Sequence, residues 1–175
     1  MKKLFLSLIL FLAAGAIECS AQKCKAGEDP ITGEPVISFD FNYRAVYFEY
    51  RKQAILMEFK MEYIGSMKVS LPAGTEVIFK LENGEILKLK TKSEAIPKSM
   101  ASSNQYSVCV YSSYSFPFEL TKEELNRFAT SKIVLIRYPD TQGGTLDFIP
   151  KGFSKKIVDE LYKGAKCIHE KIQQP

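Results

Sequence analysis

The sequence predicts an α+β fold, in which a mainly antiparallel, strongly bent β-sheet or roll of about seven or eight strands is packed against helices. Apolar residues alternate with polar ones along much of the chain, which places alternate side chains on one face of a sheet. Helical patterns occur only late, over about 121–129 and about 154–172. Because no early alternation of strands and helices is present, we expect an antiparallel sheet.

Residues 1–21 have the pattern of a cleavable secretory signal peptide. Lys2 and Lys3 form a positive end, an apolar run follows, and small residues precede a polar chain. The apolar run stops at Glu18, so it is shorter than the about 20 apolar residues that a membrane-spanning helix needs. We therefore expect a bacterial-type protein that is exported, either to the periplasm or to the medium.

The sequence leaves the cleavage position open. Cleavage after Ala21 is favoured because small residues occupy the positions that the peptidase reads, and cleavage after Ala16 fits the same rule. A third reading makes Cys19 the lipidated cysteine of a lipoprotein at the cell surface, and only this form would bind a membrane. Glu18 argues against it, because a small residue is expected directly before that cysteine.

The chain after residue 21 has the size of one domain. Residues 22–35 are expected to be a loose N-terminal segment, because they are rich in glycine and proline and poor in apolar side chains. Residues 36–175 are expected to form a single β-rich domain that the last helix closes. The formal net charge of +4, with both signs interspersed, is typical of a solvated surface and argues against a nucleic-acid partner.

The domain is expected to begin with three strands. Phe39, Phe41 and Tyr43 alternate with polar residues, and 46–50 is a further apolar stretch. A period of two then extends over nine residues and marks the third strand, with these apolar members: Ile55, Met57, Phe59, Met61 and Tyr63.

The clearest local prediction is a hairpin around Asn83 and Gly84. A two-residue loop would mix the apolar and polar faces of its two strands, whereas a three-residue loop over 82–84 pairs Phe79 with Leu87. The apolar pattern therefore selects the three-residue loop, with Gly84 at a positive φ.

The second half of the domain begins with a polar connection over 93–104. Thr121, followed three residues later by Glu124, forms a capping box that starts the short helix. The expected elements are a strand over 106–111, the short helix over about 121–129, strands over 133–138 and 145–149, and the last helix over about 154–172.

The last helix carries one apolar stripe with steps of one, three and four residues, which is typical of a helix packed on a sheet and less typical of one at a membrane surface. Gly164 lies within it and weakens it by roughly 1 kcal/mol relative to alanine.

Cys24, Cys109 and Cys167 remain after cleavage at the favoured site, and an oxidising compartment favours one disulfide and one free thiol. We expect the disulfide between Cys24 and Cys167, because it would join the two ends of the domain and contribute roughly 4–5 kcal/mol in the chain-entropy model. Cys109 lies in an apolar strand and is expected to be a small buried hydrophobe. Cleavage at the earlier site would keep Cys19 and allow a second bridge.

The sequence contains no pattern typical of a catalytic, metal or cofactor site, so none is predicted. The single histidine, His169, lies two positions from Cys167 on a helix, where side chains diverge. Zinc-ligand spacings, a calcium loop and a phosphate-binding loop are missing from the sequence. Glu58 and Glu62 lie on the polar side of a strand, and nothing in the sequence directs them into one cleft.

The best candidate for ligand binding is an aromatic stretch with interleaved serines, which contains Tyr106, Tyr111, Tyr114 and Phe116. Tyrosine supplies rigid contact area with a polar tip, so a surface of this composition is typical of recognition patches for a protein or a glycan. The competing interpretation, which we favour, is that aromatic residues simply prefer strands.

These observations favour an exported, non-catalytic module that binds a protein or a glycan or acts in the cell envelope. Two alternatives stay open. One is a small exported hydrolase-type enzyme that uses a free thiol or an acid pair. The other is a structural subunit that assembles through a strand edge.

Overall fold

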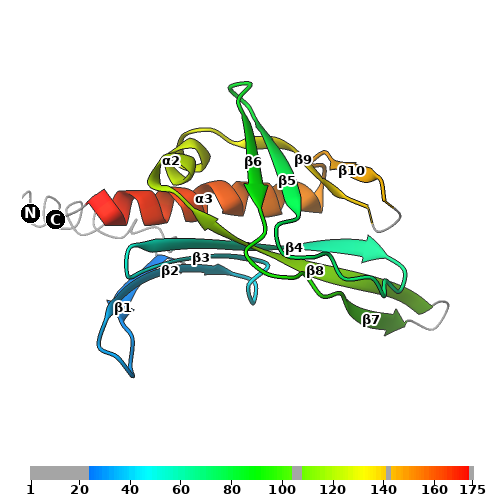
Figure 1. Ribbon diagram of the computed structural model, residues 1–175, viewed down its shortest axis with the longest axis horizontal. Helices are drawn as coiled ribbons and strands as arrows, with labels where there is room; N and C mark the ends of the chain where they lie inside the picture. The colour runs from blue at the N-terminus through cyan, green and yellow to red at the C-terminus, as the bar shows by residue number, and fades with distance from the viewer. Residues whose placement is uncertain (1–23, 104–107, 141–142, 174–175) are drawn as a thin grey trace, which may run out of the picture.

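The computed structural model describes residues 24–103, 108–140 and 143–173, so the predicted signal peptide and Tyr106 lie outside it. The described residues form ten strands and two helices (Figure 1). The elements follow in this order: β1 Cys24–Glu28, β2 Pro35–Phe41, β3 Val46–Arg51, β4 Ala54–Ile64, β5 Glu76–Leu81, β6 Ile86–Lys90, β7 Lys98–Ser103, β8 Val108–Leu120, α2 Lys122–Thr130, β9 Ile133–Pro139, β10 Thr145–Phe148 and α3 Phe153–Gln173.

The strands form two antiparallel sheets, which confirms the predicted α+β fold. The six-stranded sheet has the order β1-β2-β3-β4-β8-β7, and the four-stranded sheet has the order β10-β9-β5-β6. Figure 1 shows the six-stranded sheet as an arch, with α3 and the four-stranded sheet on the same side of it. The strands number more than the seven or eight expected, and they divide into two sheets.

The core lies between the two sheets and under α3. We call the side of the six-stranded sheet that faces these elements its inner face. Odd-numbered residues of β4 and even-numbered residues of β8 from Ser112 onward are buried there. The ring of Phe59 stacks on Phe116 and Phe118 at centroid distances of 5.6 and 5.9 Å, and Phe79 of the other sheet meets Phe59 edge-on at 5.8 Å. These rings join the sheets directly.

The helix α3 lies flat on the inner face because Gly164 has no side chain. A Cβ atom at this position would lie 2.5 Å from Cδ2 of Phe48 and 2.9 Å from Cδ1 of Phe39, closer than real Cβ contacts come. The residue that weakens the helix therefore allows it to pack on two aromatic rings. Neither helix in the described residues is long and apolar enough to cross a membrane.

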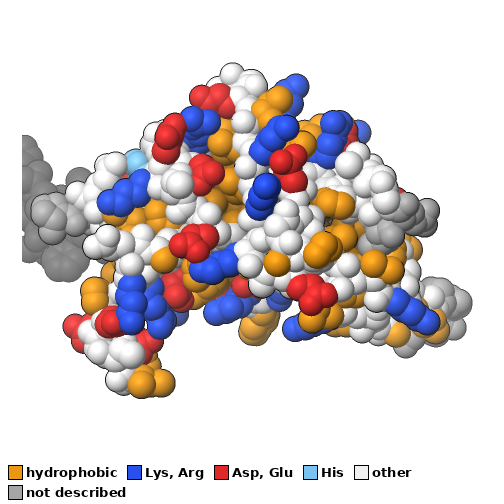
Figure 2. Space-filling view, in the orientation of Figure 1, with side chains coloured by type: hydrophobic (Ala, Val, Ile, Leu, Met, Phe, Trp, Pro, Cys, Tyr) orange, Lys and Arg blue, Asp and Glu red, His pale blue; other side chains and the backbone are white. Residues whose placement is uncertain are grey.

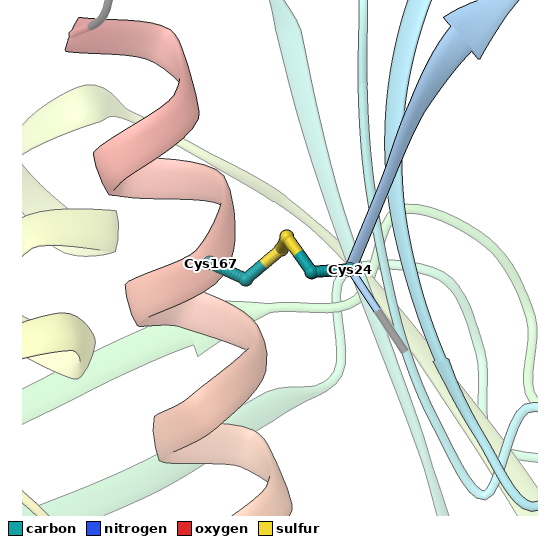
Figure 3. The surroundings of a disulfide bond; sticks show 2 residues. All are labelled: Cys24 and Cys167. Carbon is teal, nitrogen blue, oxygen red and sulfur yellow. A yellow bond between two sulfur atoms is a disulfide. The ribbon is translucent and has the colours of Figure 1, made fainter. Parts of the chain in front are cut away.

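Cys24 of β1 and Cys167 of α3 form the predicted disulfide (Figure 3), with 6.0 Å between their Cα atoms and a sequence separation of 143. The bond ties the edge strand of the six-stranded sheet to the helix that covers it. Cys109 is a free thiol and is only half-buried, whereas full burial was expected. The difference arises because the first residues of β8 are exposed or half-buried on both faces.

The two most specific local predictions are confirmed. Phe79 pairs with Leu87 across the hairpin, and Gly84 has a φ of 89°, as the three-residue loop requires. At the start of α2, the hydroxyl of Thr121 accepts a hydrogen bond from the backbone N–H of Glu124, whose carboxylate accepts one from the backbone N–H of Thr121.

Three segments differ from the expectation. The segment 22–35, expected to be loose, contains β1, whose backbone pairs with β2. The polar connection 93–104 contains β7, an edge strand that pairs with the start of β8. The third difference is the length of β8, which continues through Pro117. Proline is tolerated there because the backbone groups of Pro117 face away from β4. Its carbonyl accepts a hydrogen bond from the backbone N–H of Lys92, which lies before the start of β7, so no N–H of residue 117 is needed for the ladder.

Candidate functional site

The outer face of the six-stranded sheet points away from α3 and the four-stranded sheet, and it is polar. Even-numbered residues of β4 and odd-numbered residues of β8 lie on it, beside outward residues of β3 and β7. Its principal members are Tyr47, Glu49, Arg51, Glu58, Lys60, Glu62, Lys98, Met100, Tyr111, Ser113 and Ser115.

A groove of about 650 Å³ lies against this outer face. One end is formed by the turn between β2 and β3, residues 42–45, and the floor by outward side chains of β4, β7 and β8. Three apolar side chains from the inner side of the sheet also line the groove: Met61, Phe148 and Ile157. The groove therefore extends from the floor around the edge of β4, beyond the point where β3 begins.

Charged groups of both signs line the groove, and they differ in whether they have partners. A guanidinium nitrogen of Arg44 lies 3.5 Å from Oε2 of Glu58, and Oε1 of the same carboxylate accepts a hydrogen bond from the hydroxyl of Ser115. The ammonium of Lys60 donates to the backbone carbonyl of Tyr43 at 2.7 Å. Lys98 and Glu62 have no side-chain partner within the described residues, so a ligand would find one cation and one anion available.

A row of polar side chains continues along the outer face from the groove toward β1. The guanidinium of Arg44 lies 4.1 Å from the centre of the Tyr47 ring, and the Tyr47 hydroxyl donates to Glu49 at 2.5 Å. Arg51 lies 2.8 Å from Asp29 and 3.2 Å from Glu49. Burial, together with the hydrogen bond to Glu49, raises the pKa of Tyr47 to about 12. This part of the outer face is therefore occupied by internal contacts.

Exposed apolar side chains surround the groove. Tyr43 is 91% exposed, Ile96 64% and Met100 58%. Ile64, which is 85% exposed, lies in register with Tyr111 and Met100 across the outer face. Figure 2 shows both signs of charge and hydrophobic side chains interspersed over the visible surface, as expected for a solvated protein. Exposed apolar side chains that gather at one place are a feature of interaction sites.

The predicted aromatic site is not assembled as one patch. Tyr114 and Phe116 are fully buried in the core, and the hydroxyl of Tyr114 donates to the carbonyl of Val69 at 2.6 Å. Tyr111 is half-buried on the outer face, and Tyr106 lies outside the described residues. Strand alternation separates these residues because even positions of β8 point inward and odd positions outward. The preference of aromatic residues for strands explains Tyr114 and Phe116.

Sequence reasoning identified only part of the groove. Ser113 and Ser115 belong to the predicted stretch and do line the groove, and Glu58 and Glu62 lie on the polar side of β4 as expected. Lys98 and Met100 were missed, because β7 has no apolar alternation that distinguishes it from a loop. The alternation along β8 was a signal that could have been used, because its even-numbered residues from Ser112 onward are buried and its odd-numbered residues lie on the outer face.

The residues considered for catalysis or metal binding do not come together. Cys109 lies near the start of β8 and His169 near the end of α3, which lie at opposite ends of the molecule in Figure 1. His169 is instead 3.0 Å from the side-chain amide of Gln173. Cys167 forms the disulfide. Within the described residues, no group of three or more His, Cys, Asp or Glu side chains could hold a metal ion.

Comparison of the chain with protein-family models, with curated proteins and with solved structures gives no match.

Proposed function

We propose that this chain is an exported, non-catalytic module that binds a segment of another protein in the groove on the outer face of its six-stranded sheet. The observation that carries the proposal is the groove itself, which combines exposed apolar side chains with an available cation and anion. Its volume of about 650 Å³ is within the range of ligand sites. The signal-peptide pattern and the Cys24–Cys167 disulfide support export, since disulfides persist in oxidising compartments.

The mixture of side chains favours a protein segment over a glycan. A polypeptide can satisfy apolar contacts at Met100 and Ile96 and the charges of Lys98 and Glu62 at once. A glycan needs flat aromatic platforms, and Tyr43 is the strongly exposed aromatic ring among the described lining residues. Its exposure makes glycan binding the second candidate.

A display library of random peptides and an array of envelope polysaccharides, both probed with the full chain, test the proposal. We expect selected peptides to bind, and we expect the substitution Met100→Lys to weaken their binding. Ile86→Lys is the matched control, because Ile86 of β6 is also 58% exposed and lies outside the groove. Circular dichroism checks that both variants remain folded, and light scattering checks that they do not aggregate.

Equal loss of binding in both variants, or binding that neither substitution changes, would contradict the groove as the site. Selection of polysaccharides alone, with binding lost on substitution of Tyr43, would establish the glycan candidate in place of the protein one.

A further inference from the structure

We infer that the ligand is an extended polypeptide that adds to the six-stranded sheet as a strand beside β4, in line with β3. This inference rests on the proposed binding function and specifies its mode. It is carried by the unpaired backbone of β4 where that strand runs beyond the start of β3, together with the groove beside it.

The hydrogen-bond pattern shows which backbone groups of β4 are free. In an antiparallel ladder, successive residues direct their N–H and C=O groups to opposite neighbours. Gly65 donates to the carbonyl of Val110, so odd-numbered residues here face β8. Lys60 donates to the carbonyl of Ala45, so even-numbered residues face the β3 side. Glu62 and Ile64 therefore direct their backbone groups toward a side on which β4 has no strand partner in the described residues.

The groove occupies the position that a further strand would take. The pairing of β3 with β4 ends at Val46 and Phe59, and the turn 42–45 leads the chain away. Side chains from both faces of β4 line the groove: Lys60 and Glu62 from the outer face, and Met61 from the inner face. A hollow that contacts both faces of one strand lies at the edge of that strand. The part of β4 beyond the last backbone bond to the β3 side, that of Lys60 with Ala45, is residues 61–64, which corresponds to about 14 Å of strand.

The walls of the groove define a pattern for the ligand. In a strand that continues the direction of β3, side chains opposite Met61 would point toward Phe148 and Ile157, which are apolar. Side chains opposite Glu62 would lie on the outer face beside Glu62, in the same cross-strand row as Ser113 and Lys98. We therefore expect alternating apolar and polar residues, with main-chain pairing supplying affinity and the walls supplying selectivity.

A single extended segment fits this edge better than a second copy of the chain. The open part of β4 is short and is bounded by the turn 42–45 at one end and by Phe148 and Ile157 on the inner side. Pairing β4 with β4 of a second copy would bring the second copy's own turn and helix against these walls. The free edge thus accommodates one strand without its neighbours.

Synthetic peptides and an edge-blocking substitution test the inference. The probe is a short peptide of alternating valine and threonine with a lysine at each end, added to the isotope-labelled full chain and followed by nuclear magnetic resonance. We expect the backbone amides of Glu62 and Ile64 to shift on binding. Glu62→Pro removes the N–H that points to the open edge and should weaken binding by about tenfold or more relative to Glu62→Gln, which lacks the carboxylate but keeps that N–H, while a proline is tolerated at an edge. Lys88→Pro is the matched control, because Lys88 lies on the open edge of β6 and its N–H also points away from the sheet.

Backbone methylation of the peptide separates strand addition from other binding. Methylating the threonine nitrogens, which would face β4, should abolish binding, whereas methylating the valine nitrogens should leave it unchanged. Equal binding of both methylated peptides, or unchanged affinity in Glu62→Pro, would overturn strand addition even where Met100→Lys shows that the groove binds. No binding of the unmethylated peptide at millimolar concentration would overturn it as well, because main-chain pairing depends little on side-chain identity. Dimers of the free chain in light scattering that the peptide dissociates would assign the edge to a second copy.

Discussion

The two faces of the six-stranded sheet use the same strands for different purposes. On the inner face, Phe59, Phe116 and Phe118 stack at under 6 Å and are closed off by the second sheet and α3. On the outer face, Arg44, Glu58 and Lys98 lie along a groove that no described element covers. Of two neighbouring residues in one strand, one is thus packed in the core and the other is exposed on the outer face. We expect substitutions to affect stability on the inner face and binding on the outer face.

The largest expected effect on stability comes from the bond that fastens the helix over the inner face. Replacing both Cys24 and Cys167 with serine should lower the free energy of unfolding by roughly 4–5 kcal/mol, because the disulfide closes a loop with a sequence separation of 143. Denaturant unfolding of the folded double variant measures this. A loss below about 1 kcal/mol would show that the unfolded chain gains little freedom on release of the bond.

Adjacent residues of β8 provide the most direct comparison of the two faces. Phe116→Ala removes a fully buried ring and should cost about 3–5 kcal/mol. Ser115→Ala should cost about 1 kcal/mol or less, because Glu58 keeps its ion pair with Arg44 and access to water. Urea unfolding of the two variants tests the difference. Equal losses would mean that the outer face is as tightly packed as the inner one.

The next largest effect on stability is expected from the close packing of α3 on the inner face at Gly164. Gly164→Ala should destabilise the protein by about 1–3 kcal/mol through contact with Phe48 and Phe39, even though alanine is the better helix former by about 1 kcal/mol. Lys166→Ala on the exposed side of the same helix is the control and should change the melting temperature little. A more stable Gly164→Ala variant would show that α3 moves outward at little cost.

The smallest effect concerns pH and the outer face. The pKa of Tyr47 is raised to about 12 in the folded state, above the unfolded value near 10, so folding favours the protonated phenol. This contribution to stability is full below about pH 10 and is lost as the pH rises toward 12. The melting temperature should therefore fall more steeply between about pH 10 and pH 12 in the wild type than in Tyr47→Phe. Parallel curves would contradict the assigned pKa.

The sequence predicted best those features that depend on a few neighbouring residues. The register of the hairpin followed from the apolar positions around Gly84, and the start of α2 followed from Thr121 and Glu124. The disulfide was predictable because two cysteines lie near the two ends of the domain. Each of these features is decided by local geometry or by simple connectivity.

Features that depend on tertiary contacts were missed. The strands β1 and β7 are edge strands with few buried side chains, so no apolar alternation marks them, and their pairing comes from their neighbours. The groove was missed for a related reason, because it brings together residues distant in sequence, such as Arg44, Lys98 and Phe148. The predicted aromatic stretch grouped odd-numbered with even-numbered residues of one strand. Strand geometry places Tyr111 and Tyr114 on opposite faces of the sheet.

The position of the disulfide also determines how the molecule can be held. Cys24 and Cys167 bring the first described strand and the end of α3 to the same end of the molecule (Figure 1). Ile157, which lines the groove, lies about 24 Å along α3 from Gln173 at a rise of about 1.5 Å per residue. A tether or surface attached after Gln173 would therefore hold the molecule at the end where β1 and the end of α3 lie, and the groove would face the surrounding solution.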